Sequence, residues 1–377
     1  MDIAENNTFE HARRTAYIAL QVGRNLGVSG DQLTDIYSAA LLHDIGLINA
    51  IAEAATHCST HGLLYEHCAK GSEIVQSLPL SPKVGEYIFW HHANWDGSGE
   101  FDRQGDEIPL GSQIVYLADQ LDTQLKAMQN IYADRHNIVE FARDRQGKLF
   151  SPSVVEAFIQ AQEKEIFWLE YSRSRMEDVL PRVAPDSSLQ VDTAGLEQIA
   201  ETFAMVIDNK SPFTHTHSRG LAELLVPLSK EYGFDEETSR LLVVSGLLHD
   251  LGKLGVPNEI LDKPGKLDFT EFQLIKAHSY YTKQILSRVK GFSELAEWAG
   301  NHHETLDGTG YPEGLTGKQL SLQARMVAVC DVYQALTETR PYREDMPRSK
   351  ALEIMDGMVS RGKLCPEVYG DLKKVLG

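Results

Sequence analysis

The chain has 377 residues, 42% of them hydrophobic and 24% charged, which is ordinary for a globular protein with room for two domains. Its formal net charge of −18 argues against a broad surface for duplex nucleic acid, so an anionic ligand should be small and bound by metals and a few basic groups. No apolar run reaches the roughly 18 residues of a membrane span, and the start lacks a signal-peptide core. We expect a cytoplasmic protein that binds neither a membrane nor duplex nucleic acid, with its four cysteines reduced.

Helical periodicity runs through the sequence. Apolar residues recur at three- and four-residue intervals, which is typical of amphipathic helices, and strand-like alternation is scarce. The clearest segments are 14–26, 33–42, 154–169, 221–232, 237–248 and 323–336. We therefore predict an all-α protein made of helical bundles.

Two copies of one histidine ladder divide the chain, each with an Asp after its second His and another Asp at its end. The first ladder consists of His11, His43, Asp44, His67, His91, His92 and Asp119, and the second of His217, His249, Asp250, His278, His302, His303 and Asp331. The first His and the His-Asp pair are 32 residues apart in both ladders, and the third His and the His-His pair are 24 apart in both. Such self-similarity indicates a duplicated structural unit.

A second repeated feature marks the end of each unit. GKLFSP at 147–152 and GKLCP at 362–366 are loops followed by a Pro, which suits the first turn of a helix. Between the units, 183–195 has the Pro, Ser, Asp and Gly content of a linker, and a charged helical stretch at 161–180 leads into it. We predict a first domain over 1–185, a linker over 186–198 and a second domain over 199–377.

The ligand types point to metal. Five imidazoles and two carboxylates per unit exceed the four ligands of a structural zinc ion. They suit two divalent metal ions that share a carboxylate, and mixed nitrogen and oxygen donors favour iron or manganese, with zinc as the alternative. Asp44 and Asp250, each beside a His, are the natural bridges. A lone His is usually hydrogen-bonded or exposed, so we expect only local roles for the four without a counterpart, His57, His61, His136 and His215.

Four motifs accompany the second ladder: HDLGK at 249–253, LDKPGKL at 261–267, HHETLDGTGYP at 302–312 and DVYQALTETRPYR at 331–343. From about residue 200 to 377 the chain thereby resembles the HD-GYP family of cyclic dinucleotide phosphodiesterases, whose domains are HD-superfamily helical bundles. The resemblance implies that the second ladder binds two metal ions, with Asp250 bridging them and Lys253 touching the scissile phosphate. It also implies that the nucleotide is held by Gly310, Tyr311, Arg340 and Arg343.

By the same resemblance, the reaction hydrolyses a cyclic dinucleotide to the linear 5′-phosphorylated dinucleotide. A water shared by two cations loses its proton near neutral pH and attacks in line with the 3′-oxygen, while Lys253 neutralises charge on the phosphate. Some members carry a Glu four residues before the first His, which supports a third metal. That position is Phe213 here, so we expect two metals, and the usual Arg three residues after that His is Gly220.

The first unit keeps its ladder but has lost the substrate residues. Leu47 replaces the Lys of HDxGK, Gly99-Glu100-Phe101 replaces GYP, Ala93 stands where Glu304 would align, and Met128 and Ile131 replace the two arginines. A phosphate would lose a cation and meet an added carboxylate there. We hypothesise a second metal site that does not efficiently hydrolyse a cyclic dinucleotide and serves regulation or packing. The alternative is an HD-type nucleotidase.

Two cyclic dinucleotides are candidate substrates. Cyclic di-GMP is common in the family, whereas a degenerate HD unit before an intact one resembles the members that hydrolyse 3′3′-cyclic GMP-AMP (3′3′-cGAMP). A receptor that binds without hydrolysis and a general nucleotidase are the alternatives. Lys253, Tyr311 and the seven ligands argue against the first, and the GYP loop with Arg340 and Arg343 argues against the second. By analogy with the family, a homodimer or a complex with a GGDEF-type cyclase is an expected assembly.

Overall fold

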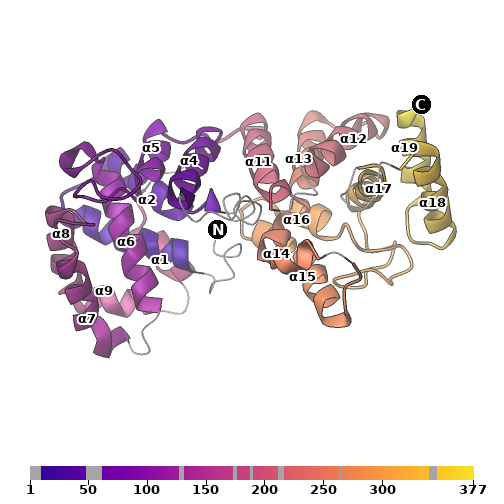
Figure 1. Ribbon diagram of the computed structural model, residues 1–377. Coiled ribbons are helices and arrows are strands. Elements are labelled where there is room, and N and C mark those ends of the chain that lie inside the picture. The colour runs from indigo at the N-terminus through magenta and orange to yellow at the C-terminus, as the bar shows by residue number, and fades with distance from the viewer. Residues whose placement is uncertain are drawn as a thin grey trace. The chain divides into compact units, whose positions relative to one another are not determined.

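The computed structural model describes most of the chain (Figure 1). The described residues are 10–47, 62–126, 131–172, 176–186, 190–210, 216–263, 265–338 and 346–377. Within these ranges the regular structure is helical and no strand forms, which confirms the predicted all-α class. None of the described helices is long and apolar enough to cross a membrane.

The chain divides into two compact units, Met1–Gln190 (unit 1) and Val191–Gly377 (unit 2). Unit 1 contains α1 (His11–Asn25), α2 (Gly30–Leu42), α4 (Leu63–Gln76), α5 (Pro82–Phe89), η1 (Gly105–Glu107), α6 (Leu110–Lys126), α7 (Ile131–Asp144), α8 (Pro152–Gln162), α9 (Glu165–Tyr171), η2 (Met176–Asp178) and α10 (Leu180–Val183). Unit 2 contains α11 (Thr193–Asp208), α12 (His217–Glu231), α13 (Glu236–Leu248), η3 (Leu251–Gly255), α14 (Asn258–Leu261), α15 (Phe269–Leu286), α16 (Ser293–Gly300), α17 (Leu322–Thr337), α18 (Arg348–Ser360) and α19 (Pro366–Leu376). The division after Gln190 falls inside the segment 186–198 that we predicted as a linker.

The helix that begins with the first ladder His lies at the centre of each unit. In unit 1, α1 packs against α2, α6 and α8, and in unit 2, α12 packs against α13, α17 and α19. On α12, Leu221, Leu225 and Leu228 are fully buried at the spacing that lines one face of a helix. Burial of one such side chain contributes roughly 1.5–3 kcal/mol. This apolar stripe therefore fixes His217, at the start of the same helix, relative to the core.

The two GKL loops take equivalent places. The backbone N–H of Asp96 donates to the carbonyl oxygen of Lys148 at 2.9 Å, and that of Asp307 donates to Gly362 at 3.0 Å. The helices that follow these loops, α8 and α19, both begin at a proline, as predicted. Each closing loop thus supports the segment that follows the His-His pair.

The charged stretch predicted at 161–180 is not one helix. Lys164 is extended, with a ψ of 121°, and separates α8 from α9. Phe167, Trp168 and Tyr171 on α9 are buried, and α9 contacts α1 and α8, so their burial holds this segment on unit 1. Helices lie on both sides of the division between the units, α10 before it and α11 after it.

Candidate metal centres

The His-Asp pair of unit 2 lies where a helix ends. His249 is the C-cap of α13, and Asp250 directly precedes η3. The Nδ1–H of His249 donates to the carbonyl oxygen of Gly246 at 2.7 Å, so Nε2 is the ring nitrogen that faces the centre. That Nε2 is buried and has no hydrogen-bond partner among the described residues. A buried ring nitrogen without a partner is costly, and a metal ion would satisfy it.

The same arrangement recurs around both centres. Four further imidazoles bond through Nδ1 to the carbonyl oxygen three residues earlier, at 2.6 to 2.9 Å. The pairs are His43 with Ala40, His91 with Ile88, His278 with Ile275 and His302 with Ala299. Contacts of this kind fix the tautomer and orientation of metal-binding imidazoles.

The two carboxylate oxygens of Asp250 face different imidazoles. Oδ2 lies 3.2 Å from Nε2 of His249 and 3.9 Å from that of His217, whereas Oδ1 lies 3.4 Å from Nε2 of His278 and 4.0 Å from that of His302. When two ligand atoms each lie about 2.1 Å from the same metal ion and the angle between them at the metal is near tetrahedral, the two atoms are about 3.4 Å apart. The spacing at Asp250 therefore fits one cation on each side of its carboxylate.

All seven residues of the second ladder come together. The ligand atoms of His278, His302 and His303 lie within 4.8 Å of one another, and those of His217, His249 and Asp331 do so as well. Oδ1 of Asp331 is 3.2 Å from Nε2 of His217. Asp250 stands between the two groups.

Unit 1 repeats this geometry. Oδ2 of Asp44 lies 3.2 Å from Nε2 of His43, and Oδ1 lies 3.1 Å from Nε2 of His67. Oδ1 of Asp119 is 3.3 Å from Nε2 of His11. The rings of the His-His pair lie within 5.0 to 5.4 Å of neighbouring ladder rings. The structure thus brings the seven residues of the first ladder together as well.

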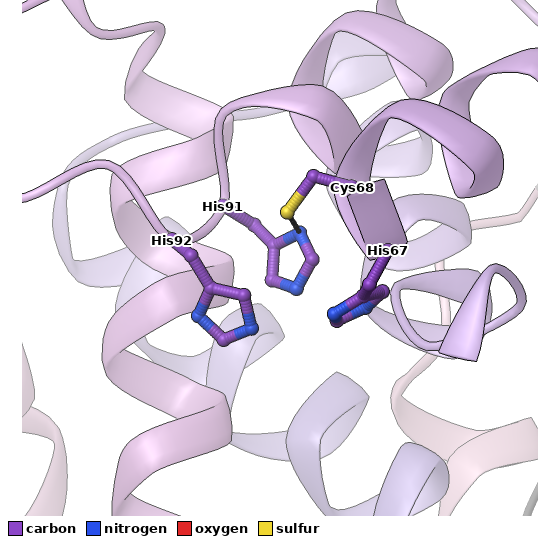
Figure 2. Close-up of side chains that lie close together, drawn as sticks. All are labelled: His67, Cys68, His91 and His92. Carbon is purple, nitrogen blue, oxygen red and sulfur yellow. Dashed lines mark hydrogen bonds between the residues drawn. The ribbon is translucent and has the colours of Figure 1, made fainter. Parts of the chain in front are cut away.

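Cys68 lies beside the unit 1 centre without joining it. Figure 2 shows its thiol next to the ring of His91, with His67 and His92 grouped around the same ring. Its Sγ is 3.5 Å from Nδ1 of His91, the nitrogen that already donates to Ile88, rather than from the partner-free Nε2. Burial raises the pKa of the Cys68 thiol, which disfavours the thiolate that a metal requires. Cys68, Cys330 and Cys365 are free and buried, as expected of reduced structural cysteines, and Cys58 lies outside the described residues.

The electrostatics of unit 2 suit cations. Burial opposes ionisation of Asp250, but the charges of His249 and Lys253 outweigh it and hold its carboxyl pKa well below the usual value. Burial lowers the pKa of His278 to about 3, so this imidazole is neutral, as a metal ligand must be. Burial also opposes protonation of His217, yet the carboxylates of Asp331 and Glu338 raise its pKa to about 9. The buried carboxylates therefore favour positive charge at this centre.

Carboxylates behind the first His were missed by the sequence analysis. Oδ2 of Asp122 lies 2.6 Å from Nδ1 of His11, and Oε2 of Glu338 lies 3.1 Å from Nδ1 of His217. Asp122 and Glu338 follow the last Asp of their ladders by three and seven residues, spacings that share one face of a helix. That spacing is the signal that could have revealed them.

The predicted substrate residues of unit 2 gather beside its centre. Lys253 Nζ donates to Oδ2 of Asp250, and the ring of Tyr311 lies 4.8 Å from that of His303. Close packing favours glycine at residue 310, because a Cβ there would stand 2.5 Å from Cα of Glu304. Arg340 and Arg343, and also Phe213, lie outside the described residues.

Glu304 holds the loop that follows Tyr311. Its carboxylate accepts backbone N–H bonds from Glu313, Gly314 and Leu315 at 2.7, 3.0 and 2.9 Å. Unit 1 has no carboxylate at the equivalent position. This position is Ala93, which is buried in a small apolar cluster with Phe101.

Gly220, which replaces the family's Arg, faces a long side chain. A Cβ on Gly220 would stand 2.3 Å from Nε2 of Gln334 on α17, so the end of Gln334 occupies the space that a side chain at residue 220 would need. The glycine thus permits a close contact between α12 and α17.

In unit 1, Glu100 bonds the start of a helix. We predicted that its charge disfavours phosphate in the pocket, and the structure adds a second role: its carboxylate accepts the backbone N–H groups of Gly62 and Tyr65, both at 3.0 Å. It therefore satisfies free donors at the start of α4, where a negative charge is favourable. Phe101 packs against Tyr65 and Trp90, with ring centroids 5.7 and 5.8 Å away. An aromatic cluster thus stands where unit 2 has its GYP loop.

Comparisons with known proteins cover both units. A family model described as HD domain matches residues 1–139 and 201–368. The chain is 32% identical to 3′3′-cGAMP-specific phosphodiesterase 1 of Vibrio cholerae, over 98% of this chain and 88% of that protein. It is 31% identical to phosphodiesterase 3 of the same name and organism, over 100% of this chain and 92% of that protein.

Two further similarities bear on fold and family. A cyclic di-GMP phosphodiesterase of Pseudomonas aeruginosa is 39% identical over 44% of this chain and 40% of its own length. The crystal structure of a cyclic GMP-AMP-specific phosphodiesterase of Vibrio cholerae matches with a TM-score of 0.72 and 29% identity, over 100% of this chain and 94% of that chain. With two converging His-Asp ladders, and matches that span both units, the chain belongs to the HD-domain family, in its HD-GYP branch.

Proposed function

We propose that this protein hydrolyses 3′3′-cGAMP to the linear 5′-phosphorylated dinucleotide, and that its catalytic domain is the predicted second domain, 199–377. The observation that carries the proposal is the carboxylate of Asp250, whose two oxygens face separate imidazole groups beside Lys253. The choice of 3′3′-cGAMP over cyclic di-GMP rests on the relatives, because those that match nearly the whole chain carry the former name. The cyclic di-GMP phosphodiesterase of Pseudomonas aeruginosa matches only 44% of it.

We propose two divalent metal ions for this site. One would be held by His217, His249 and Asp331 and the other by His278, His302 and His303, with Asp250 shared between them. The mixed nitrogen and oxygen donors favour iron or manganese. When bound, such ions act as Lewis acids toward phosphate and lower the pKa of water near them toward neutrality.

The side chains of unit 2 supply the rest of the reaction. Lys253, within hydrogen-bond distance of Asp250, is placed to neutralise charge that grows on the phosphate oxygens. Water adds to phosphorus, the P–O3′ bond breaks, and the 3′-oxygen leaves as a hydroxyl, so the product keeps a 5′-phosphate. Tyr311 faces His303 and would bound the nucleotide on that side, held there by the loop that Glu304 supports. Arg340 and Arg343 remain predicted nucleotide contacts.

The proposal is tested by anaerobic purification, metal analysis and chromatography of the products formed from 3′3′-cGAMP and cyclic di-GMP. We expect two metals in unit 2, faster turnover of 3′3′-cGAMP, and a linear product with a 5′-phosphate. A metal-replete protein that cleaves neither substrate, or that releases them unchanged after tight binding, would contradict hydrolysis and favour the receptor. Cleavage of nucleoside monophosphates alone would favour the nucleotidase.

For unit 1, we propose that its ladder binds metal without hydrolysing a cyclic dinucleotide. The partner-free Nε2 atoms of His43 and His91 support metal binding. Loss of the cation at Leu47, and the carboxylate of Glu100 in the place that Tyr311 has in unit 2, argue against substrate binding. In the full-length Asp250→Asn variant, turnover of any phosphate ester that a further His43→Ala change abolishes would favour the nucleotidase instead.

A homodimer or a complex with a GGDEF-type cyclase stays a prediction. Size-exclusion chromatography with light scattering tests the first, and co-purification with a cyclase tests the second.

A further inference from the structure

Two side chains of α15 lie beside Tyr311 at the edge of the unit 2 site. The ring of Phe272 is 6.4 Å from that of Tyr311, with an angle of 78° between the ring planes. Nζ of Lys276 lies 5.0 Å from the ring centroid of Phe272 and 5.7 Å from that of Tyr311. Tyr311 in turn faces the metal-centre residue His303. The rings of Phe272 and Tyr311 and the ammonium group of Lys276 thus form a cluster beside the metal centre, which we call the corner.

The corner offers a ligand both an exposed aromatic ring and an ammonium group without an acidic partner among the described residues. Phe272 is 44% exposed, so part of its ring is open to a ligand. Among the described residues no carboxylate pairs with Lys276, whereas Lys253, Lys263 and Lys283 each pair with at least one. In a chain with a net charge of −18, an unpaired ammonium beside the active site is a local attraction for an anion.

The shape of the proposed substrate calls for such a group. A cyclic dinucleotide carries two phosphates and two bases, and only one phosphate is cleaved at a time. The metal-centre residues and Lys253 account for that phosphate. The other phosphate needs a cation, and a base that leaves the centre needs a flat apolar surface, since bases bind proteins by stacking on aromatic rings.

The duplicated unit offers an internal comparison. Lys276 and Tyr65 occupy equivalent positions, each two residues before the third ladder His. A second member of the corner, Tyr311, aligns with Glu100, which bonds the start of α4. Unit 1 therefore keeps its metal-type ladder but lacks the ammonium of this corner, which separates the corner from the residues needed for metal binding.

We propose that Phe272 and Lys276 bind the half of the cyclic dinucleotide that is not being cleaved. The ring of Phe272 stacks on the base of that half. Lys276 moves away from the rings of Phe272 and Tyr311 and pairs with the phosphate of that half. Lys276 is only partly buried, and contacts between such an ammonium and aromatic rings are weak, so little opposes this movement. The inference rests on the proposed function, because it concerns the same substrate and the same site.

The test compares two substrates across matched variants. Steady-state kcat and KM are measured for 3′3′-cGAMP and for bis(p-nitrophenyl) phosphate, a diester with one phosphate and no base. The variants are Phe272→Ala, Lys276→Gln and Lys276→Arg. The controls are Phe269→Ala, an aromatic residue that is 78% exposed near the start of the same helix, and Lys350→Gln, an exposed lysine at the start of α18.

We expect Phe272→Ala and Lys276→Gln each to raise the KM for 3′3′-cGAMP about tenfold, the typical effect of one stacked base or one lost phosphate contact. Their kinetics with the small diester should stay at the wild-type level, and Lys276→Arg should recover most of the affinity. Equal losses with both substrates would show a structural role and overturn the inference, as would an unchanged KM. If the wild-type protein cleaves the small diester but no cyclic dinucleotide, the proposed function itself fails, and this inference falls with it.

Discussion

A Cβ atom on Gly252 would stand 1.9 Å from the carbonyl oxygen of His278, so no side chain fits between these two residues. Gly46 and His67 have the same relationship in unit 1, at 2.2 Å. The turn after each His-Asp pair therefore presses against the backbone of the helix that carries the third His. This close approach brings Asp250 within reach of both ligand groups.

The Gly252→Ala variant should separate these two segments. We expect a loss of about 1–3 kcal/mol in the free energy of unfolding, as for other overpacked cores, together with loss of hydrolysis. Gly370→Ala is the matched control, because a Cβ there meets nothing within 4 Å and α19 should gain roughly 0.5–1 kcal/mol from the better helix former. Urea denaturation and product chromatography report on both variants. A Gly252→Ala protein as stable and active as wild type would contradict the close contact.

Asp250→Asn should abolish catalysis, because an amide cannot place a negative oxygen toward both ligand groups. We expect a fall in kcat of about 10³-fold, comparable to the removal of other central electrostatic contacts, and loss of the metal bound in unit 2. Asp44→Asn is the matched variant in unit 1, and it should lose metal there while most hydrolysis remains. Metal analysis and steady-state rates measure both effects. A large loss of hydrolysis in Asp44→Asn would place catalysis in unit 1.

Glu304→Ala should release the loop beside Tyr311. Three backbone N–H donors, from Glu313 to Leu315, would lose their acceptor, which costs about 1–3 kcal/mol where such donors stay buried. We expect a higher KM for the cyclic dinucleotide, because the loop then samples positions that do not fit it. Glu353→Ala, at an exposed position of α18, is the control. Unchanged KM and stability in Glu304→Ala would show that these bonds do not position the loop.

Lys210 gives a prediction about pH. Its Nζ donates to the carbonyl oxygen of Leu254 next to Lys253, and burial lowers its pKa from 10.5 to about 8. The folded protein thus releases this proton at lower pH than the unfolded chain, so the stability due to Lys210 rises between pH 8 and 10.5 and is constant below that range. Over the whole range the gain is about 3 kcal/mol at most.

Urea denaturation at several pH values measures this gain. The advantage of wild type over Lys210→Met should grow as the pH is raised above 8, whereas Lys230→Met, at an exposed position of α12, should follow the wild-type pH dependence. Parallel curves for wild type and Lys210→Met would mean that Lys210 keeps an ordinary pKa.

Much of the fold and the grouping of ladder residues could be predicted because helix geometry fixes them locally. His249 and His302 lie at or just beyond helix ends and bond their own preceding turn, so their spacing along the chain carries the arrangement. The role of Glu100 could not be predicted, because its partner Tyr65 is 35 residues away in sequence. The break at Lys164 was missed because a charged segment with helical periodicity does not reveal where buried aromatic rings turn the chain.

The bonds from Glu100 to the start of α4 also limit how unit 1 can change. A single reversion to Tyr at this position would restore the motif residue but leave the N–H groups of Gly62 and Tyr65 without their acceptor. A change of Leu47 to Lys would return the cation of the HDxGK motif but would not replace these bonds. If unit 1 does not hydrolyse a cyclic dinucleotide, as proposed, gain of that activity would thus require several substitutions together, and the change at Glu100 is unfavourable alone.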